Sequence, residues 1–193
     1  MDARDWDERY REHDHLWSVT PNLFVADRLS QADPGRGLDL AAGEGRNSIW
    51  LSSKGWRMTA VDFSEVAISK GRSKSDDVEF VVADITEWEP EDSFDLILMA
   101  YLHLASHEFE SLVRRSTGWL APGGELFLIG HAVSNLDQGW GGPPSPEVLW
   151  DVPVVVSWLE GMTIVEAEVV NRPVDTEEGR RHARDALIRA RVS

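Results

Sequence analysis

Short apolar runs separated by polar, glycine-rich turns dominate the first two thirds of the chain. The run at residues 94–100 is nearly continuous in apolar residues, as expected for a strand covered on both faces. Similar runs are predicted as strands at 36–41, 57–62, 78–84 and 125–131. Stretches with helical spacing lie between several of these strands, at 46–54, 64–73 and 106–120. This alternation predicts an α/β fold with a parallel sheet.

The pattern changes after residue 131. Residues 132–150 are rich in glycine and proline and predict a long loop, which in compact domains is usually functional or disordered. Residues 151–156 allow two interpretations. Pro153 suits the first turn of a helix, whereas the β-branched run that follows it suits a strand.

The last quarter of the chain completes the predicted sheet. Residues 162–171 alternate as a strand does, 172–181 are polar and predict a turn, and 182–192 fit either a strand or a helix. With two late strands added to five, we expect a three-layer, doubly wound sheet of seven strands, mostly parallel, with an antiparallel last strand. Ligands of such sheets bind beyond the carboxyl ends of the strands.

Composition narrows the function. The chain has 193 residues, a formal net charge of -15 and a pI near 4.7, so it repels a phosphate backbone and non-specific nucleic-acid binding is not expected. It has no cysteine, which excludes disulfides, thiolate metal sites and a cysteine nucleophile, and which fits a reducing cytoplasm. No apolar run is long enough for a membrane span, and the acidic start is unlike a signal peptide. We therefore expect a soluble, cytoplasmic protein.

The first predicted strand leads into a turn of small residues, Ala42-Gly43-Glu44-Gly45, followed by a helix that begins near Arg46 or Asn47. Two glycines allow positive φ and close approach of a ligand, and the helix start presents unpaired N–H groups. A nucleotide-type ligand is expected. The third glycine of the dinucleotide pattern is missing, because Arg46, Asn47 and Ser48 follow Gly45.

Aspartates close the predicted strands. Asp62 follows Gly45 by 17 positions and suits two ribose hydroxyls. Asp84 suits an exocyclic amine of adenine, with Phe63 and Ile85 beside the ring. The alternative for each aspartate is to cap the turn that follows its strand. Asp39 lies within its strand, where the alternative is to order the glycine turn.

The segments LDLAAGEGRNSIWLSSKGW, AVDFSEVAISKGR, VVADITEW, FDLILMAYLHL and LAPGGELFLIGH, in this order over residues 36–131, resemble the class I S-adenosylmethionine-dependent methyltransferases. The opening WDERYREHDHLWSVTPNLFV resembles the small tellurite-resistance and thiopurine methyltransferase-like branch. The chain departs from the class at Ala41, where the first glycine is usual.

The resemblance implies a Rossmann-like methyltransferase fold, S-adenosyl-L-methionine as cofactor, and no metal. It places Gly43 and Gly45 against the methionine part, Asp62 on the ribose, and Asp84 with Ile85 at the adenine. The full set of expected cofactor residues is Asp39, Ala41, Gly43, Gly45, Asn47, Asp62, Phe63, Ala83, Asp84, Ile85, Ala100, Trp17 and Asn22. From its length and the absence of a linker-like stretch, we expect one domain over 1–193, made of a helical lid (1–30), a cofactor-binding core (36–131), a substrate loop (132–150) and a terminal helix or strand with a strand pair (151–193).

Methyl transfer from a sulfonium is an in-line displacement that depends chiefly on orientation. His103 and His131 follow the fourth and fifth strands, and either is a candidate base where the acceptor must lose a proton. Tyr101 is a candidate wall of the methyl channel. The alternative for the histidines is to bind backbone carbonyls in the loops.

The acceptor is expected to be a small molecule methylated on sulfur, oxygen, nitrogen or a metalloid oxyanion, bound by a monomer or homodimer. Aromatic residues outside the core motifs form either an apolar lid or core packing: Trp6, Tyr10, Trp17, Trp140 and Trp150. Two other functions stay open at this point. They are a nicotinamide-dependent oxidoreductase of similar fold and a non-catalytic S-adenosylmethionine-binding protein.

Overall fold

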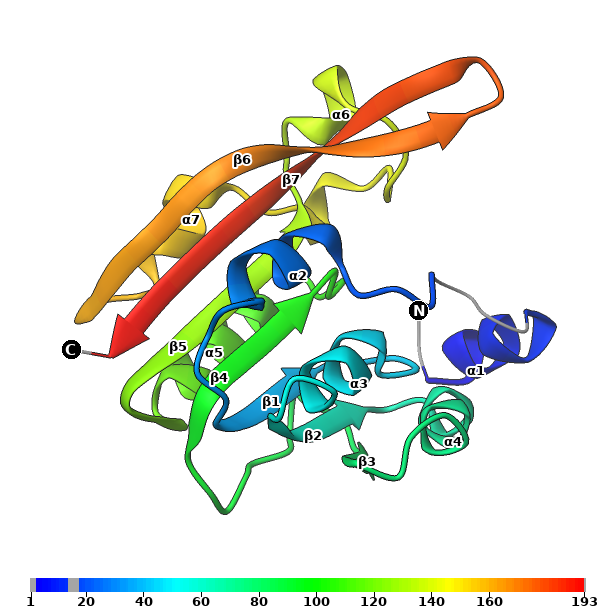
Figure 1. Cartoon of the computed structure of the whole chain (residues 1–193). Coiled ribbons are helices and arrows are strands. Elements are labelled where there is room, and N and C mark those ends of the chain that lie inside the picture. Colours follow the sequence, from blue (N-terminus) through cyan, green and yellow to red (C-terminus); the bar gives the residue numbers. More distant parts are fainter. Residues whose placement is uncertain (1–2, 14–17, 193) are drawn as a thin grey trace. The chain divides into compact units, whose positions relative to one another are not determined.

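The computed structural model describes residues 3–13 and 18–192 (Figure 1). Its contacts divide the chain into two compact units, 1–100 and 101–193. Each unit is described by itself. In the described part of the chain, no helix is long and apolar enough to cross a membrane.

The first unit consists of parallel strands with helices between them. Its strands lie side by side in the order β3-β2-β1-β4, and each neighbouring pair is parallel. Their inner positions are almost completely buried, as the apolar runs predict. The elements are α1 (Ala3–Glu12), α2 (Leu23–Leu29), β1 (Arg36–Leu40), α3 (Arg46–Ser52), β2 (Arg57–Asp62), α4 (Glu65–Arg72), β3 (Val78–Val82) and β4 (Phe94–Ala100).

Helix α1 is fastened to α4 by polar contacts at its inner side. The Asp7 carboxylate accepts hydrogen bonds from the Ser64 hydroxyl at 2.6 Å and from the Val66 N–H at 3.3 Å. The Lys70 ammonium donates to the backbone carbonyls of Tyr10 and His13. A helix with almost no buried apolar residues is thus held by bonds to the start and the last turn of its neighbour.

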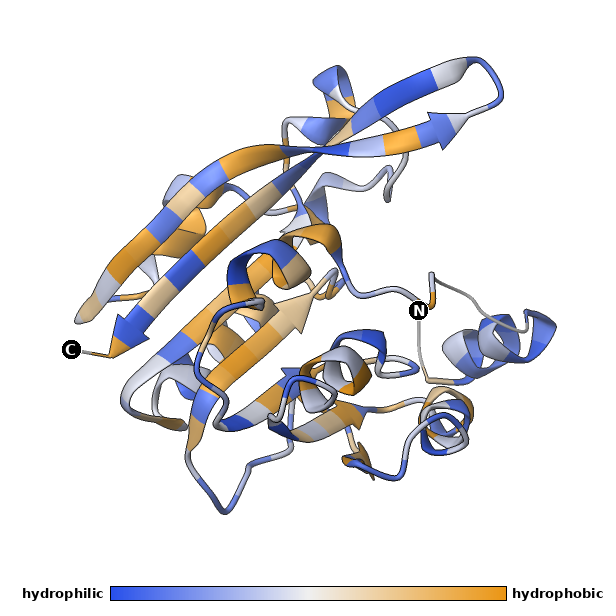
Figure 2. Cartoon of the chain, viewed as in Figure 1, coloured by the Kyte–Doolittle hydropathy of each residue, from blue (hydrophilic) through white to orange (hydrophobic). Residues whose placement is uncertain are grey.

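The second unit is built around a long hairpin. Strand β7 pairs antiparallel with both β5 and β6, so the order is β5-β7-β6. Figure 2 shows alternating polar and apolar residues along the hairpin. The elements are α5 (Ser106–Thr117), β5 (Leu120–His131), α6 (Asn135–Gln138), the 3₁₀ helix η1 (Pro146–Val148), α7 (Val152–Ser157), β6 (Met162–Thr176) and β7 (Gly179–Val192).

A buried carboxylate joins the strands of this unit. Glu125 on β5 accepts from Arg189 at 2.6 Å and from Arg191 at 2.9 Å, both on β7. Arg189 also reaches Glu166 on β6 at 3.3 Å. Because Glu125 and Arg189 are mostly buried, this network fixes the register of all three strands more firmly than an exposed ion pair would.

The prediction of a seven-stranded α/β sheet, mostly parallel with an antiparallel last strand, is confirmed. The two open segments are also settled, since 151–156 falls largely in helix α7 and 182–192 lies in strand β7. The division of the chain into one domain with a lid, a core and a substrate loop stays a prediction.

Two boundaries were wrong. Residues 172–181 do not form a turn, because most of them extend the hairpin to a tip at Glu177 and Glu178. Polar residues are tolerated there because residues 177–182 are all exposed, and the strand before the tip alternates between exposed and half-buried positions. Strand β5 begins at Leu120, so the Pro-Gly-Gly segment that was expected to end a helix lies inside a strand.

Asp39 links β1 to α3. Its carboxylate is 1% exposed and accepts a 2.7 Å hydrogen bond from the Ser48 hydroxyl. Burial raises the pKa of Asp39 to about 7, although the bond from Ser48 and the charge of Arg46 lower it in part. The folded protein therefore holds a proton on Asp39 over a range in which the unfolded chain has lost it.

The raised pKa of Asp39 makes the free energy of unfolding depend on pH. Between about pH 4 and pH 7 the folded state binds the extra proton, so the wild-type free energy of unfolding falls as the pH rises, relative to Asp39→Asn. As the pH rises from about 4 to about 7, we expect the free energy of unfolding of Asp39→Asn to increase by roughly 1–4 kcal/mol relative to that of the wild type. Urea unfolding measures both free energies. The exposed Asp76→Asn is the control, and a difference that does not change with pH contradicts the assignment.

Candidate functional site

The turn after β1 is left-handed at three of five positions. The φ angles are +57° at Ala41, +58° at Gly43 and +74° at Gly45, which precedes the first residue of α3. Gly43 and Gly45 adopt this region without strain, whereas a residue with a Cβ pays about 1–2 kcal/mol. Ala41 therefore adopts the left-handed conformation that glycine usually has at this position, although alanine carries a Cβ.

Asp62 at the end of β2 closes this turn. One carboxylate oxygen accepts from the Gly43 N–H at 2.8 Å, and the other accepts from the Ser64 N–H at 2.9 Å. Burial raises the pKa of Asp62, and these two N–H groups lower it in part. An ionised carboxylate offers about four acceptor positions, so two are left for the hydroxyls of a ligand. The residues present therefore fit the ribose of the expected cofactor.

Asn22 and Asn47 are both buried and are joined by a hydrogen bond. The Asn22 N–H donates to the Asn47 side-chain oxygen at 2.9 Å, and the Asn22 side-chain oxygen caps α2 by accepting from Phe24 and Val25. The structure thus gives both residues a structural task, which joins the start of α2 to α3. Asp39 likewise has a structural contact, because it accepts the bond from Ser48 on α3.

Asp84 follows β3 and is exposed. Its side-chain oxygen accepts from the Thr86 N–H at 2.9 Å and from the Thr86 hydroxyl at 2.7 Å, which is the capping alternative. The next residue, Ile85, is buried. An exposed carboxylate beside a buried apolar residue still provides an acceptor next to an apolar surface.

The remaining expected cofactor residues lie at strand ends of the same unit. The Ala83 N–H donates to the Asp62 carbonyl at 3.0 Å, which places the end of β3 beside that of β2. Phe63 and Ala100 are half-buried directly after or at the end of their strands. Trp17 lies outside the described residues.

Tyr10 reaches the glycine turn from α1. A Cβ added to Gly43 would lie 2.6 Å from the Tyr10 hydroxyl, and the tyrosine side chain is buried. From the sequence, Tyr10 was expected either in an apolar lid or in core packing. Its spacing on a charged helix gave no signal that the hydroxyl meets the glycine turn.

In the second unit, Tyr101 starts the segment after β4 with a left-handed φ of +57°. Its N–H donates to the Ile129 carbonyl at 2.7 Å, and its hydroxyl donates to Asp185 at 2.6 Å. Such a conformation persists only where surrounding contacts hold it, and these two bonds do so.

Asp185 lies on β7 directly opposite His131 of β5. Its first carboxylate oxygen lies 3.3 Å from Nδ1 of His131 without the alignment of a hydrogen bond, and its second accepts from Tyr101 at 2.6 Å and from Nε of Arg172 at 2.7 Å. Burial of the carboxyl raises its pKa, but the contacts with His131, Arg172 and Tyr101 outweigh it and hold the pKa of Asp185 below its usual value. A fully buried carboxylate is thus kept ionised by three partners.

The structure brings together the three residues expected on the acceptor side. The ring centroids of Tyr101 and His131 are 4.9 Å apart, and those of His103 and His131 are 6.1 Å apart. Asp185 and Arg172 were missed. Neither follows a parallel strand, and only the strand register, which the sequence left undetermined, places Asp185 beside His131 and Arg172 beside Asp185.

Residues 38–124 match a family model described as a methyltransferase domain. Trans-aconitate 2-methyltransferase of Escherichia coli O157:H7 (strain EC4115) is 32% identical over 168 residues, which cover 86% of this chain and 57% of that protein. The chain spans between 36% and 57% of the length of the curated relatives reported.

Two solved structures share the fold. The N-methyltransferase NodS from Bradyrhizobium japonicum WM9, in complex with S-adenosyl-L-homocysteine, superposes with a TM-score of 0.71 at 21% identity and covers 100% of this chain and 99% of its own. TehB from Haemophilus influenzae gives a TM-score of 0.76 at 18% identity and covers 97% of this chain and 66% of its own.

The fold agrees with these structures over the whole chain, and the sequence match covers the segment that carries the glycine turn and Asp62. Residues 38–124 thus match a methyltransferase domain, and the expected resemblance of the chain to the class I S-adenosylmethionine-dependent methyltransferases is confirmed by this match and by the shared fold.

Proposed function

We propose that this protein transfers a methyl group from S-adenosyl-L-methionine to a small-molecule acceptor. The observation that carries the proposal is the left-handed turn from Ala41 to Gly45, closed by the carboxylate of Asp62. This arrangement leaves acceptor positions on Asp62 beside a turn that is held in the left-handed conformation. The named methyltransferase relatives support the same reaction.

The cofactor, when bound, supplies a methyl group on a positively charged sulfur. In this proposal Asp62 accepts hydrogen bonds from its ribose hydroxyls, and Asp84 with Ile85 contacts the adenine. Gly43 and Gly45 lie against the methionine part, where the Tyr10 hydroxyl already stands over Gly43. The chain contributes position rather than covalent chemistry, since orientation alone is worth about 7–11 kcal/mol.

His131 is the proposed base for an acceptor that must lose a proton. The Asp185 carboxylate faces Nδ1, which favours the proton on that nitrogen and leaves Nε2 free to accept one. Because Arg172 and Tyr101 hold the carboxylate, the histidine ring keeps one orientation. Tyr101 also forms a wall beside the ring, and His103 is the alternative base.

The proposal does not specify which atom of the acceptor receives the methyl group: sulfur, oxygen, nitrogen or a metalloid oxyanion. The relative named above acts, by its name, on trans-aconitate, which is a small molecule. That name supports a small acceptor here and no more specific one. The cytoplasmic location and the monomeric or homodimeric state stay predictions.

Asp62→Ala tests the cofactor site. We expect the Kd for S-adenosylmethionine to rise more than tenfold, because hydrogen bonds to a charged carboxylate are worth about 1.5–3 kcal/mol. Calorimetric titration measures the affinity, and far-ultraviolet circular dichroism checks the fold, since Asp62 also holds the turn. Asp62→Asn, which preserves shape, and the exposed Asp76→Ala are the matched variants. An unchanged Kd in the folded Ala variant overturns the ribose assignment.

His131→Ala tests the base. With the acceptor that gives the highest rate of S-adenosylhomocysteine release in a screen, kcat is expected to fall about 10²–10⁴-fold while the cofactor Kd stays within twofold. Asp185→Asn should lower kcat less and shift the pH profile, because it alters the histidine's tautomer and not the histidine itself. His182→Ala, an exposed histidine on the same hairpin, is the control. Full activity of His131→Ala with a proton-bearing acceptor removes His131 from this role.

A further inference from the structure

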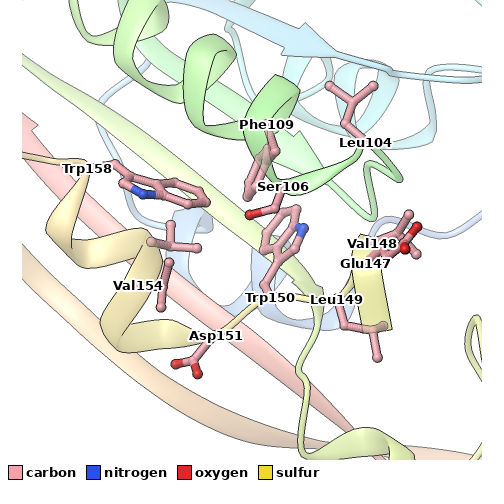
Figure 3. Close-up of a pocket in the computed structure, with 11 residues that line it drawn as sticks. Leu104, Ser106, Phe109, Glu147, Val148, Leu149, Trp150, Asp151, Val154 and Trp158 are labelled. Atoms are coloured by element: carbon pink, nitrogen blue, oxygen red, sulfur yellow. The ribbon is translucent and has the colours of Figure 1, made fainter. Parts of the chain in front are cut away.

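A cavity of about 160 Å³ lies within the second unit, between the start of α5 and the segment from Glu147 to Trp158. Figure 3 shows the rings of Phe109, Trp150 and Trp158 near one another among the residues that line it. Phe109 stacks on Trp150 with ring centroids 4.4 Å apart at 18°, and meets Trp158 edge-on at 5.7 Å and 81°. We call this cavity the ring pocket.

The ring pocket has a buried aromatic wall, and its exposed lining residues include both apolar and acidic side chains. Phe109, Trp150 and Trp158 are between 2% and 8% exposed, so the aromatic wall is fixed in the core. Val154, at 45%, is the exposed apolar residue at the opening. An apolar protein cavity of about 150 Å³ accepts a benzene molecule. The ring pocket therefore matches the volume of a single six-membered ring.

Acidic side chains line the outer part. Glu147 and Asp151 are both exposed and both border the pocket, as does the Ser106 hydroxyl. Of the described residues that line it, none is a lysine or an arginine. The whole chain carries a net charge of -15, which adds to the same potential. A ring with a cationic substituent is favoured here, and a ring with a carboxylate is disfavoured.

The ring pocket is connected to His131, the proposed base, through a backbone hydrogen bond. The Trp150 N–H donates to the His131 carbonyl at 2.8 Å. The Trp150 ring also lies against Gly130, where an added Cβ would be 2.8 Å from it. Leu104, another lining residue, directly follows His103. The ring pocket and His131 therefore share the backbone at the end of β5, with the Trp150 ring on the face of Gly130 and the His131 side chain on the opposite face of the strand.

We propose that the ring pocket binds the ring of the methyl acceptor, and that the acceptor belongs to the single-ring arylalkylamines. The ring lies against Trp150 and Trp158, and the ammonium group lies toward the exposed acidic side of the pocket, which Glu147 and Asp151 border. The identification as acceptor rests on the proposed function. The binding itself does not require the cofactor.

Calorimetric titration of the full chain without cofactor tests the proposal. The probes are 2-phenylethylamine, the anionic 3-phenylpropionate and the ringless n-propylamine. Saturable one-to-one binding is expected for 2-phenylethylamine, at least about tenfold tighter than for either of the others. Tighter binding of the carboxylate, equal binding of the ringless amine, or no saturable binding of 2-phenylethylamine overturns the proposal.

Two variants locate the site. Val154→Trp fills the mouth without removing core packing and should abolish binding of 2-phenylethylamine. Val165→Trp is the matched control, because Val165 is equally exposed, lies on β6 and does not border the pocket. The double variant Glu147→Gln with Asp151→Asn should bind the amine and the carboxylate with affinities within about threefold of each other. Unchanged binding in Val154→Trp contradicts the location.

A parallel titration with S-adenosylmethionine separates the two proposals. Amine binding without cofactor binding overturns the proposed methyl transfer and leaves the ring pocket as a binding site. Cofactor binding without amine binding overturns the ring pocket and leaves the methyl transfer intact. Val154→Trp is expected to leave the cofactor Kd within twofold of wild type, since every residue assigned to the cofactor belongs to the first unit.

Discussion

The buried carboxylate of Asp62 is the constraint on which the cofactor region depends. Its two oxygens bind N–H groups of Gly43 and Ser64, so the left-handed turn after β1 and the start of α4 are fixed by one side chain. Ser64 in turn binds Asp7 and so helps to hold α1. Placing that carboxylate at low exposure has an energetic cost, and the raised pKa of Asp62 reflects it. The cost is explained if the site must present ionised oxygen atoms to a polyhydroxyl ligand.

In the second unit, Asp185 is the buried carboxylate on which the neighbouring side chains depend. It is completely buried within β7, yet it is held ionised by Arg172, Tyr101 and His131. A buried charge with this many partners is weak evidence for stability, because an apolar replacement often does as well. It is better explained by the orientation that it imposes on His131. The strained backbone of Tyr101, which is held by the same carboxylate, is consistent with a functional site.

The sequence predicted the parallel strands well because each is a short apolar run bounded by turn residues, and the glycine turn had a recognisable pattern. It could not place Asp185 beside His131, because an alternation of arginines and small apolar residues over 182–192 suits a strand or a helix. It also could not decide between ligand and structural roles for Asp39, Asn22 and Asn47. Their hydrogen bonds to Ser48 and to each other depend on how α2 and α3 pack, which periodicity does not encode.

Calorimetric titration of the wild-type chain with S-adenosylmethionine, S-adenosylhomocysteine and NAD in parallel tests the central claim most directly. We expect S-adenosylmethionine and S-adenosylhomocysteine to bind with micromolar Kd and one-to-one stoichiometry, and NAD not to bind. The missing third glycine after Gly45 and the acceptor positions on Asp62 are the reasons for this order. Binding of NAD alone would contradict the account, and binding of none of the three would show that the glycine turn does not serve a nucleotide.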